Sequence, residues 1–338
     1  MKWETTTEWN VGLDLGLLNN RLNVTAELYS RVISDLLNSR NLMSYHELST
    51  IMGNVGSTQS EGFELTVNSK NIDLPHFGWS TDLTFSFYRD KWKERERDWK
   101  PASYNNYVEP IRAFYGYLSD GIIQAGEQVP HMSGALPGQV KIKDIDGFQL
   151  DKNGNPIVDE YGRALKTGKP DGKLDEADKV MYGSKDPGYI FGFNNTFRYK
   201  RFDLNFYMYG QFNKLIAGDF YNQIAGLDGF QYGSNFPVTV KDAWSHDHPQ
   251  GKIPGVAQAM SPYGVGDYCF YKTWFLRMRN ITLGYNIPVK QLSKFRIYLD
   301  VNNPFIFTNY KGFDPETDSN YCAYPNVRSF SFGVDLTF

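Results

Sequence analysis

The 338-residue chain lacks the features that mark several common protein classes. It contains no apolar run approaching the ~20 residues that a membrane-spanning helix needs, and no apolar stretch suited to a signal peptide follows Met1. Its net charge is −3, whereas nucleic-acid binding needs a basic patch, so we expect no nucleic-acid partner. No serine–histidine–acid arrangement, paired-carboxylate site or phosphate loop stands out, so we infer that the chain is not an enzyme.

Alternation of apolar and polar residues is what the chain has in quantity. In the closing segment SFSFGVDLTF (329–338), every second residue from Phe330 to Phe338 is apolar. A period of two indicates a β-strand with one apolar face, and the 24 phenylalanines and 23 tyrosines also favour strands. Nine segments show this pattern clearly: 10–18, 21–31, 62–68, 79–89, 189–199, 202–212, 273–288, 295–303 and 329–338.

The spacing of these segments predicts how the strands are connected. Short links around Asn19-Asn20, Ser69–Phe77, Lys200-Arg201 and Pro288–Lys294 alternate with long loops, which run over 38–58, 91–188, 214–268 and 304–326. Short periplasmic turns and long external loops are typical of outer-membrane barrels. The prediction is therefore an all-β transmembrane antiparallel β-barrel with long extracellular loops, whose last strand ends at the periplasm. A soluble β protein is the alternative, although a sandwich would distribute its loops more evenly.

The number of strands is left open at one place. Between the strands at 77–89 and 189–199 the membrane crossings must be even in number, and FYGYLSDGIIQAG (114–126) is either one of a pair or external. The total is then nine or eleven, whereas bacterial barrels of one chain have an even number. An open sheet in lipid leaves backbone groups unsatisfied. We therefore expect a partial barrel, with the missing strands before Met1.

The motifs also resemble a known family. TTTEWNVGLDLGLLNNRLNVTAELYSRVISDLL (5–37), NVGSTQSEGFELTV (54–67), GFNNTFRYKRFDLNFYMYGQF (192–212), FLRMRNITLGYNIP (275–288), GFDPE (312–316) and YPNVRSFSFGVDLTF (324–338) resemble, in this order, segments of the SusC/RagA family of TonB-linked outer-membrane proteins. The similarity covers nearly the whole chain. The resemblance implies that 1–338 is the carboxyl-terminal part of a TonB-dependent receptor β-barrel, without the amino-terminal plug and early strands of that family.

The resemblance further implies a function and partners. The whole protein would be an active nutrient importer in the outer membrane of a Gram-negative, Bacteroidetes-like cell. It would contact outer-membrane lipid and take up oligosaccharides (glycans) or peptides together with a SusD-like surface lipoprotein, and TonB would act through the missing amino-terminal region. Two alternatives stay open: a soluble β-rich carbohydrate-binding module with a structural calcium ion, and a passive porin that needs no plug.

One segment suggests a metal ion. In KPDGKLDEADKVMYG (169–183), the run from Asp171 to Asp175 with Asp178 matches positions five to nine and twelve of an EF-hand-like calcium loop, including the glycine at position six. An insertion separates it from KDIDG (143–147). A split loop could gather five carboxylates around Ca²⁺, the one cofactor that we consider: Asp144, Asp146, Asp171, Asp175 and Asp178. The alternative is a solvated acidic turn, because motif matches carry false positives.

Aromatic residues of the lumen and loops are the predicted substrate contacts: Tyr207, Tyr209, Tyr221, Tyr232 and Trp244. For Trp244, in WSHDHP (244–249), packing within its loop is the alternative. Arg277 and Arg279 precede a phase shift at Asn280, which indicates a β-bulge. The bulge would let both arginines face the lumen, where we expect them to contact the plug rather than substrate.

Cys269 and Cys322 are the only two cysteines. The predicted topology places both near the external ends of strands that are two apart, ~10 Å from each other in the sheet. A disulfide tolerates at most ~7 Å between α-carbons. The cysteines can pair only if the 304–326 loop folds over the intervening strand.

Overall fold

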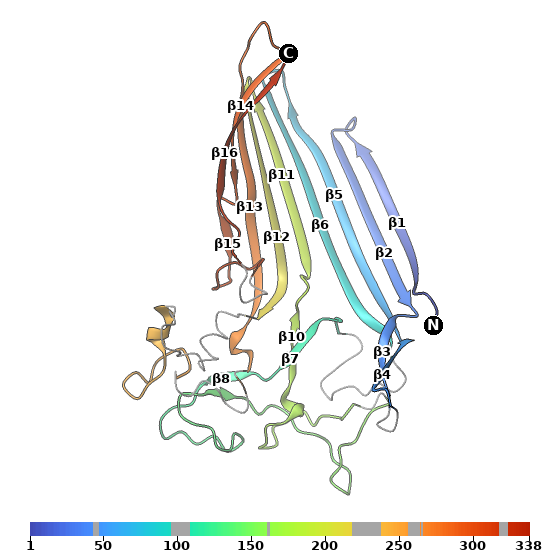
Figure 1. Ribbon diagram of the computed structural model, residues 1–338, viewed down its shortest axis with the longest axis vertical. Helices are drawn as coiled ribbons and strands as arrows, with labels where there is room; N and C mark the ends of the chain where they lie inside the picture. Colours follow the sequence, from blue (N-terminus) through green and yellow to red (C-terminus); the bar gives the residue numbers. More distant parts are fainter. Residues whose placement is uncertain are drawn as a thin grey trace.

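A tall antiparallel sheet dominates the computed structural model, with a layer of loops and short strands at one end (Figure 1). The structure describes residues 1–42, 47–95, 109–160, 163–217, 238–255, 264, 266–317 and 324–338. The sheet order is β1-β2-β5-β6-β11-β12-β13-β14-β16, and β15 also pairs with β13. The all-β antiparallel fold that the sequence predicts is confirmed.

The strands of the main sheet are β1 (Thr5–Leu17), β2 (Leu22–Ser34), β5 (Ser57–Asp73), β6 (Phe77–Glu94), β11 (Tyr189–Tyr199), β12 (Phe202–Ala217), β13 (Phe270–Asn286), β14 (Lys294–Asn302), β15 (Ile306–Thr308) and β16 (Ser329–Thr337). The loop layer holds β3 (Leu37–Asn41), β4 (Thr50–Asn54), β7 (Ala113–Gly116), β8 (Ser119–Ile122), β9 (Val140–Ile142) and β10 (Val180–Ser184). No helix in the described ranges is both long enough and apolar enough to cross a membrane.

The open question about the strand count is settled by the pairing of β6 with β11. Leu83 on β6 lies opposite Phe193 on β11, so no further strand separates them. The segment 114–126 instead contributes to β7, which pairs with β10, and to β8, which pairs with β9. Among the described residues, nine long strands therefore form the wall, and β1 and β16 are its two open edges.

Register keeps the apolar side chains on one face across the sheet. Leu13, Ala26, Leu65, Phe85 and Phe191 lie opposite one another on five successive strands. A slip of one residue in any pair would move that strand's apolar set to the other face. The face as observed is uncovered by protein: the side chain of Leu13, for example, is 55% exposed. An apolar surface of this extent marks a membrane or an interface.

A compact cluster of buried apolar side chains lies outside the main sheet, in the loop layer. Ile123, Met132, Val140 and Ile142 form it, each at most 2% exposed. The short links at the opposite end are tight turns. Leu18, Asn19 and Asn20 follow β1 with φ of 53°, 55° and 60°, a left-handed conformation that asparagine tolerates better than most residues. The loops can therefore build a small folded layer, while the links only reverse the chain.

Candidate functional site: the inner face and external mouth of the wall

The inner face of the sheet is lined by a hydrogen-bonded polar network. Asp82 on β6 accepts from Asn68 Nδ2 on β5 at 2.8 Å and from Asn194 Nδ2 on β11 at 3.1 Å. Asn194 Oδ1 accepts in turn from Asn205 Nδ2 on β12 at 2.9 Å. Four neighbouring strands thus present polar groups to the side opposite the apolar face. This polarity is what a water-filled interior requires of a barrel wall.

A second polar group continues the inner face on β13 and β14. Asp300 accepts from Asn280 Nδ2 and from the Thr282 hydroxyl, each at 2.6 Å, and from Asn302 Nδ2 at 2.9 Å. A carboxylate with three donors is well solvated by the protein itself. The inner face therefore carries hydrogen-bonded polar side chains on β5, β6, β11 and β12 and again on β13 and β14.

The predicted bulge lies on β13 and is confirmed. Tyr207 pairs with Asn280 and Met208 pairs with Met278, so Arg279 is the extra residue. A bulge re-aims side chains, and here both arginines point to the inner side. Arg277 is 4% exposed on this inner side. On the lipid-facing side of a barrel wall, an arginine would be destabilising.

The two arginines contact acids of the loop between β15 and β16. Arg277 Nη2 lies 2.5 Å from Asp314 Oδ1, and Arg277 Nε lies 2.5 Å from Glu316 Oε2. Arg279 Nη2 also bonds Glu316. Asn326 donates to Asp314 through its backbone N–H at 2.9 Å and its side chain at 3.1 Å. We call these five residues the arginine–carboxylate cluster.

Burial makes this cluster a structural anchor. The side chains of Arg277 and Asp314 are 5% and 4% exposed, and buried charges are tolerated only when they are paired and hydrogen-bonded. The described part of the 303–328 loop is therefore held against the inside of β13. Sequence reasoning anticipated the inward arginines but assigned them to a plug, and contact with a plug stays a prediction.

Two of the predicted substrate-contact tyrosines lie on the inner face of β12. Tyr209 packs against Phe275 with ring centroids 6.0 Å apart, and the Arg279 guanidinium carbon lies 5.3 Å from its ring centroid. Tyr207 is 36% exposed and its ring covers Gly192, where an added Cβ would lie 3.3 Å from the tyrosine hydroxyl. Tyr207 is thus the more accessible of the two. Their contact with substrate stays a prediction.

The other three predicted contacts have different outcomes. Tyr221 and Tyr232 lie outside the described residues. Trp244 is only 5% exposed, and its Nε1 donates to Gln124 Oε1 at 3.0 Å. The ring also lies against His246, with centroids 5.2 Å apart. Trp244 therefore packs within the loop layer, as the alternative expected, and its contact with substrate stays a prediction.

The aspartates of the predicted calcium loop are used for backbone hydrogen bonds. Buried Asp178 accepts from the Ile145 backbone N–H at 2.7 Å, and Asp144 accepts from the Gly172 N–H at 2.7 Å. Asp146 accepts from the Gly168 N–H at 2.7 Å. Each of these bonds holds one part of the split loop to another.

The remaining two aspartates bond locally, and the set does not fit a calcium ion. Asp171 accepts from the Lys173 N–H at 2.9 Å, and Asp175 caps the short 3-10 helix Glu176–Asp178. Within the described ranges, no group of three or more His, Cys, Asp or Glu side chains is placed to hold a metal, whereas Ca²⁺ takes six to eight oxygens. The geometry matches the acidic-turn alternative, and calcium binding stays a prediction for titration.

An ion-pair group stabilises the loop layer near its core. Lys141 Nζ lies 2.9 Å from Glu127 Oε1 and 3.3 Å from Asp120 Oδ2. The Gln124 backbone N–H and the Lys141 ammonium lower the pKa of Glu127 below its usual value. The hydrogen bond from Lys141 to Glu127 is the largest cause of the raised pKa of Lys141.

Pairing of Cys269 with Cys322 stays a prediction, because Cys322 lies outside the described residues.

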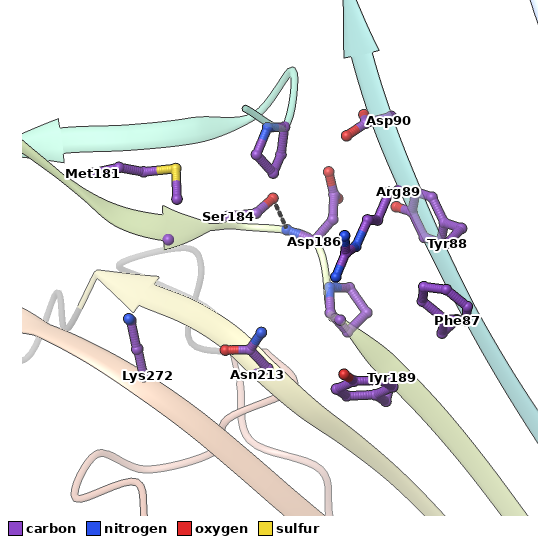
Figure 2. Close-up of a pocket in the computed structure, with 14 residues that line it drawn as sticks. Phe87, Tyr88, Arg89, Asp90, Met181, Ser184, Asp186, Tyr189, Asn213 and Lys272 are labelled. Carbon is purple, nitrogen blue, oxygen red and sulfur yellow. Dashed lines mark hydrogen bonds between the residues drawn. The ribbon is translucent and has the colours of Figure 1, made fainter. Parts of the chain in front are cut away.

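A cavity of about 320 Å³ opens at the external mouth of the wall, where β6, the β10–β11 link, β12 and β13 meet (Figure 2). Asp186, on the link, is paired with Arg112 at 2.6 Å, and its backbone N–H donates to Ser184 Oγ at 3.1 Å. Sequence reasoning missed this cavity, because its lining comes from five segments that are far apart in the chain and share no motif.

Comparison with known proteins agrees with this architecture. Residues 1–136 match the family described as TonB dependent receptor-like, beta-barrel. The chain is 31% identical over 359 residues to TonB-dependent receptor SusC of Bacteroides thetaiotaomicron and 29% identical over 374 residues to TonB-dependent receptor P3 of Formosa agariphila. Both alignments cover 100% of this chain but 32% and 34% of the relatives. The chain therefore spans about a third of the length of the curated relatives it matches.

A solved structure of the RagAB peptide transporter is similar in fold. It superimposes with a TM-score of 0.76 and 21% identity, covering 100% of this chain and 36% of that one. The open antiparallel wall, the polar inner face and the SusC-like sequence agree with one another. Residues 1–136 belong to the TonB-dependent receptor β-barrel family, and over its whole length the chain is similar to TonB-dependent receptors.

Proposed function

We propose that the chain is the carboxyl-terminal part of the barrel of an outer-membrane importer that takes up oligosaccharides or peptides in a TonB-dependent manner. One observation carries the proposal: a nine-stranded wall with an uncovered apolar face on one side and a hydrogen-bonded polar face on the other. Lipid is the solvent that makes such an apolar face stable, and water is the one that makes such a polar face stable. The two relatives named above are TonB-dependent receptors, which supports the same assignment.

Different parts of the wall would have different roles in uptake. The polar inner face provides hydrogen-bond partners for a hydrophilic substrate, and Tyr207 adds an accessible ring. The arginine–carboxylate cluster holds the described part of the loop between β15 and β16 against the inner wall. The family relationship supports a plug that TonB pulls upon and a SusD-like lipoprotein that covers the mouth.

The experiment that tests this proposal compares cells with and without the complete gene. We expect the deletion strain to lose growth on one class of oligosaccharide or peptide as sole nutrient, and complementation to restore it. A protonophore should stop uptake, because TonB-dependent transport is energised, whereas uptake through a passive porin would continue. Equal growth of both strains on oligosaccharide and peptide panels would overturn the proposal.

The rival soluble module is tested by fractionation. We expect the protein in the detergent-extracted outer-membrane fraction, together with a surface lipoprotein when crosslinked. Recovery of the protein as a monodisperse species without detergent would favour the carbohydrate-binding module instead. The absence of enzymatic activity stays a prediction.

A further inference from the structure

A row of aromatic rings crosses the outward face near its external end. Tyr189 on β11 pairs with Phe212 on β12, which pairs with Trp274 on β13. Phe87 on β6 extends the row, because its neighbour Ser86 pairs with the residue after Tyr189. The ring centroids of Phe87 and Tyr189 are 6.1 Å apart, and those of Phe212 and Trp274 are 6.2 Å apart. Aromatic rows of this kind lie at the membrane–water interface of barrels.

Two cations lie on the same face, two residues closer to the loop layer than the aromatic row. Arg89 follows Phe87 by two residues on β6, and Lys272 precedes Trp274 by two residues on β13, so strand alternation puts all four on one side. Three strand spacings separate β6 from β13, which is about 14 Å in the sheet. Figure 2 shows the two cations on opposite sides of the cavity at the mouth.

Both cations are exposed, and within the described part of the chain no acid forms an ion pair with either of them. Glu61 lies opposite Arg89 on β5 and accepts from Gln59 Nε2 at 2.7 Å. Of the acids that line this cavity, Asp186 is paired with Arg112 at 2.6 Å. Asp90 accepts from the Ile111 N–H at 3.3 Å, and alternation directs it to the inner face.

A neighbouring cavity extends the region on the other side of β6. Its volume is about 360 Å³, and it shares Phe87 and Arg89 with the first cavity. Trp9 contributes an exposed ring, and Glu61, opposite Arg89 in register, contributes the one acid of this lining. Below both cavities the apolar outward face continues through Phe85. A ligand at Arg89 can therefore have a charged end and a long apolar end.

We propose that Arg89 and Lys272, above the ring of Tyr189, form a binding site for the phosphate-bearing headgroup of a lipid in the outer leaflet. This inference rests on the proposed placement of the wall in the outer membrane. A cation that faces lipid is inexpensive at the interface but gains energy when it meets an anionic headgroup. The apolar face below accommodates the acyl chains, which a free phosphate ion would leave uncovered. The two cations together with the apolar face below them favour a lipid with an anionic headgroup over a free phosphate ion.

The test measures lipid binding by the complete receptor, purified in a neutral detergent. Native mass spectrometry would follow titration with diphosphoryl lipid A, with diacylglycerol, which has no phosphate and no charge, as the neutral lipid. We expect a preference for the phosphorylated lipid. We expect about fivefold weaker binding for Arg89→Gln or for Lys272→Gln, and about 25-fold for the double variant. Lys152→Gln, which removes an exposed cation of the loop layer, is the matched control and should bind like the wild type.

Three results would overturn the proposal: equal affinity of the double variant and the wild type, equal affinity for the neutral lipid, or displacement of the lipid by millimolar inorganic phosphate. Heat-dependent mobility on a gel verifies that each variant is folded. The outcome is separable from the proposed function. A receptor that binds the lipid but supports no uptake retains this site and loses the importer assignment, whereas a protein that is soluble without detergent loses both.

Discussion

Replacing Arg277 with methionine should release the loop between β15 and β16 from the inner wall. Arg277 Nη2 donates to Asp314 at 2.5 Å, and Arg277 Nε lies 2.5 Å from Glu316 as an ion pair. Methionine keeps most of the volume while removing the charge. Asp314 would then stay buried with donors only from neutral groups of its own loop, such as the Asn326 backbone N–H at 2.9 Å. The loop should respond by opening, since opening restores water to the carboxylate.

The size of the effect follows from burial. Removing one partner of a buried ion pair costs about 3–5 kcal/mol, much of it from the charge that is left behind. Arg277 and Asp314 are 5% and 4% exposed, so the screening that weakens surface pairs does not apply here. A cost of about 3 kcal/mol raises the population of the open loop about 100-fold. Replacing both residues, Arg277 with Met and Asp314 with Leu, should recover most of this loss, because no unpaired charge remains at that position.

Limited trypsin digestion measures this opening, because Lys311 and Arg328 flank the anchored segment. When opening and closing are fast, the cleavage rate follows the open population. We expect the single variant to be cut about 100-fold faster than the wild type and the double variant to be cut much more slowly than the single one. Arg198→Met is the control, because Arg198 is an exposed residue at the opposite end of the wall. A single variant cut within threefold of the wild type would refute the reasoning.

Three further predictions follow from the wall and the loop layer. Leu65→Arg puts a charge on the outward face and should lower the free energy of unfolding by about 2–4 kcal/mol near mid-depth. Thr66→Arg, at the next residue and facing inward, should lower it far less. Urea unfolding of the refolded barrel compares the two variants, and equal losses would contradict the face assignment. The Gln124 N–H and Lys141 lower the pKa of Glu127 in the folded state. The stability that Glu127 gives to the loop layer should therefore be present above the unfolded pKa of the carboxyl and be lost as the pH falls through the folded pKa. Hydrogen exchange of the loop layer, measured against pH, checks this, and Glu127→Gln should remove the pH dependence. Gly251→Ala would put a Cβ 2.6 Å from a backbone nitrogen and should destabilise its loop by about 1–3 kcal/mol; a proteolysis rate like that of the wild type would show that the loop has room.

The strands and their connections were predictable from local pattern. Period-two alternation around Leu13, Phe85 and Phe332 is a property of a few neighbouring residues, and it survives in the structure with register that preserves the faces. The bulge before Asn280 was predictable for the same reason, because a phase shift in alternation is visible in the chain. The position of 114–126 outside the main sheet was not predictable, since it depends on β6 pairing with β11 across a long loop.

The site was less predictable, because side chains distant in the sequence build it. An acidic run resembling a calcium loop was visible, but whether its oxygens face an ion or backbone N–H groups depends on how the two halves of the loop fold together, as Asp144 and Gly172 show. Trp244 was visible as a ring, but its burial depends on Gln124, 120 residues away. Composition cannot indicate which loop aromatics pack and which stay accessible.

The sequence by itself therefore determined the apolar and polar faces of the wall, its short and long connections and its family, because alternation and motifs are short-range properties. The tertiary structure alone decided that nine long strands form the wall among the described residues, that Arg277 anchors the described part of the loop between β15 and β16 through Asp314, and that Arg89 and Lys272 flank one cavity. Each of these depends on contacts between segments separated by tens to hundreds of residues. Such contacts are selected by the free energy of the whole fold rather than by local propensity.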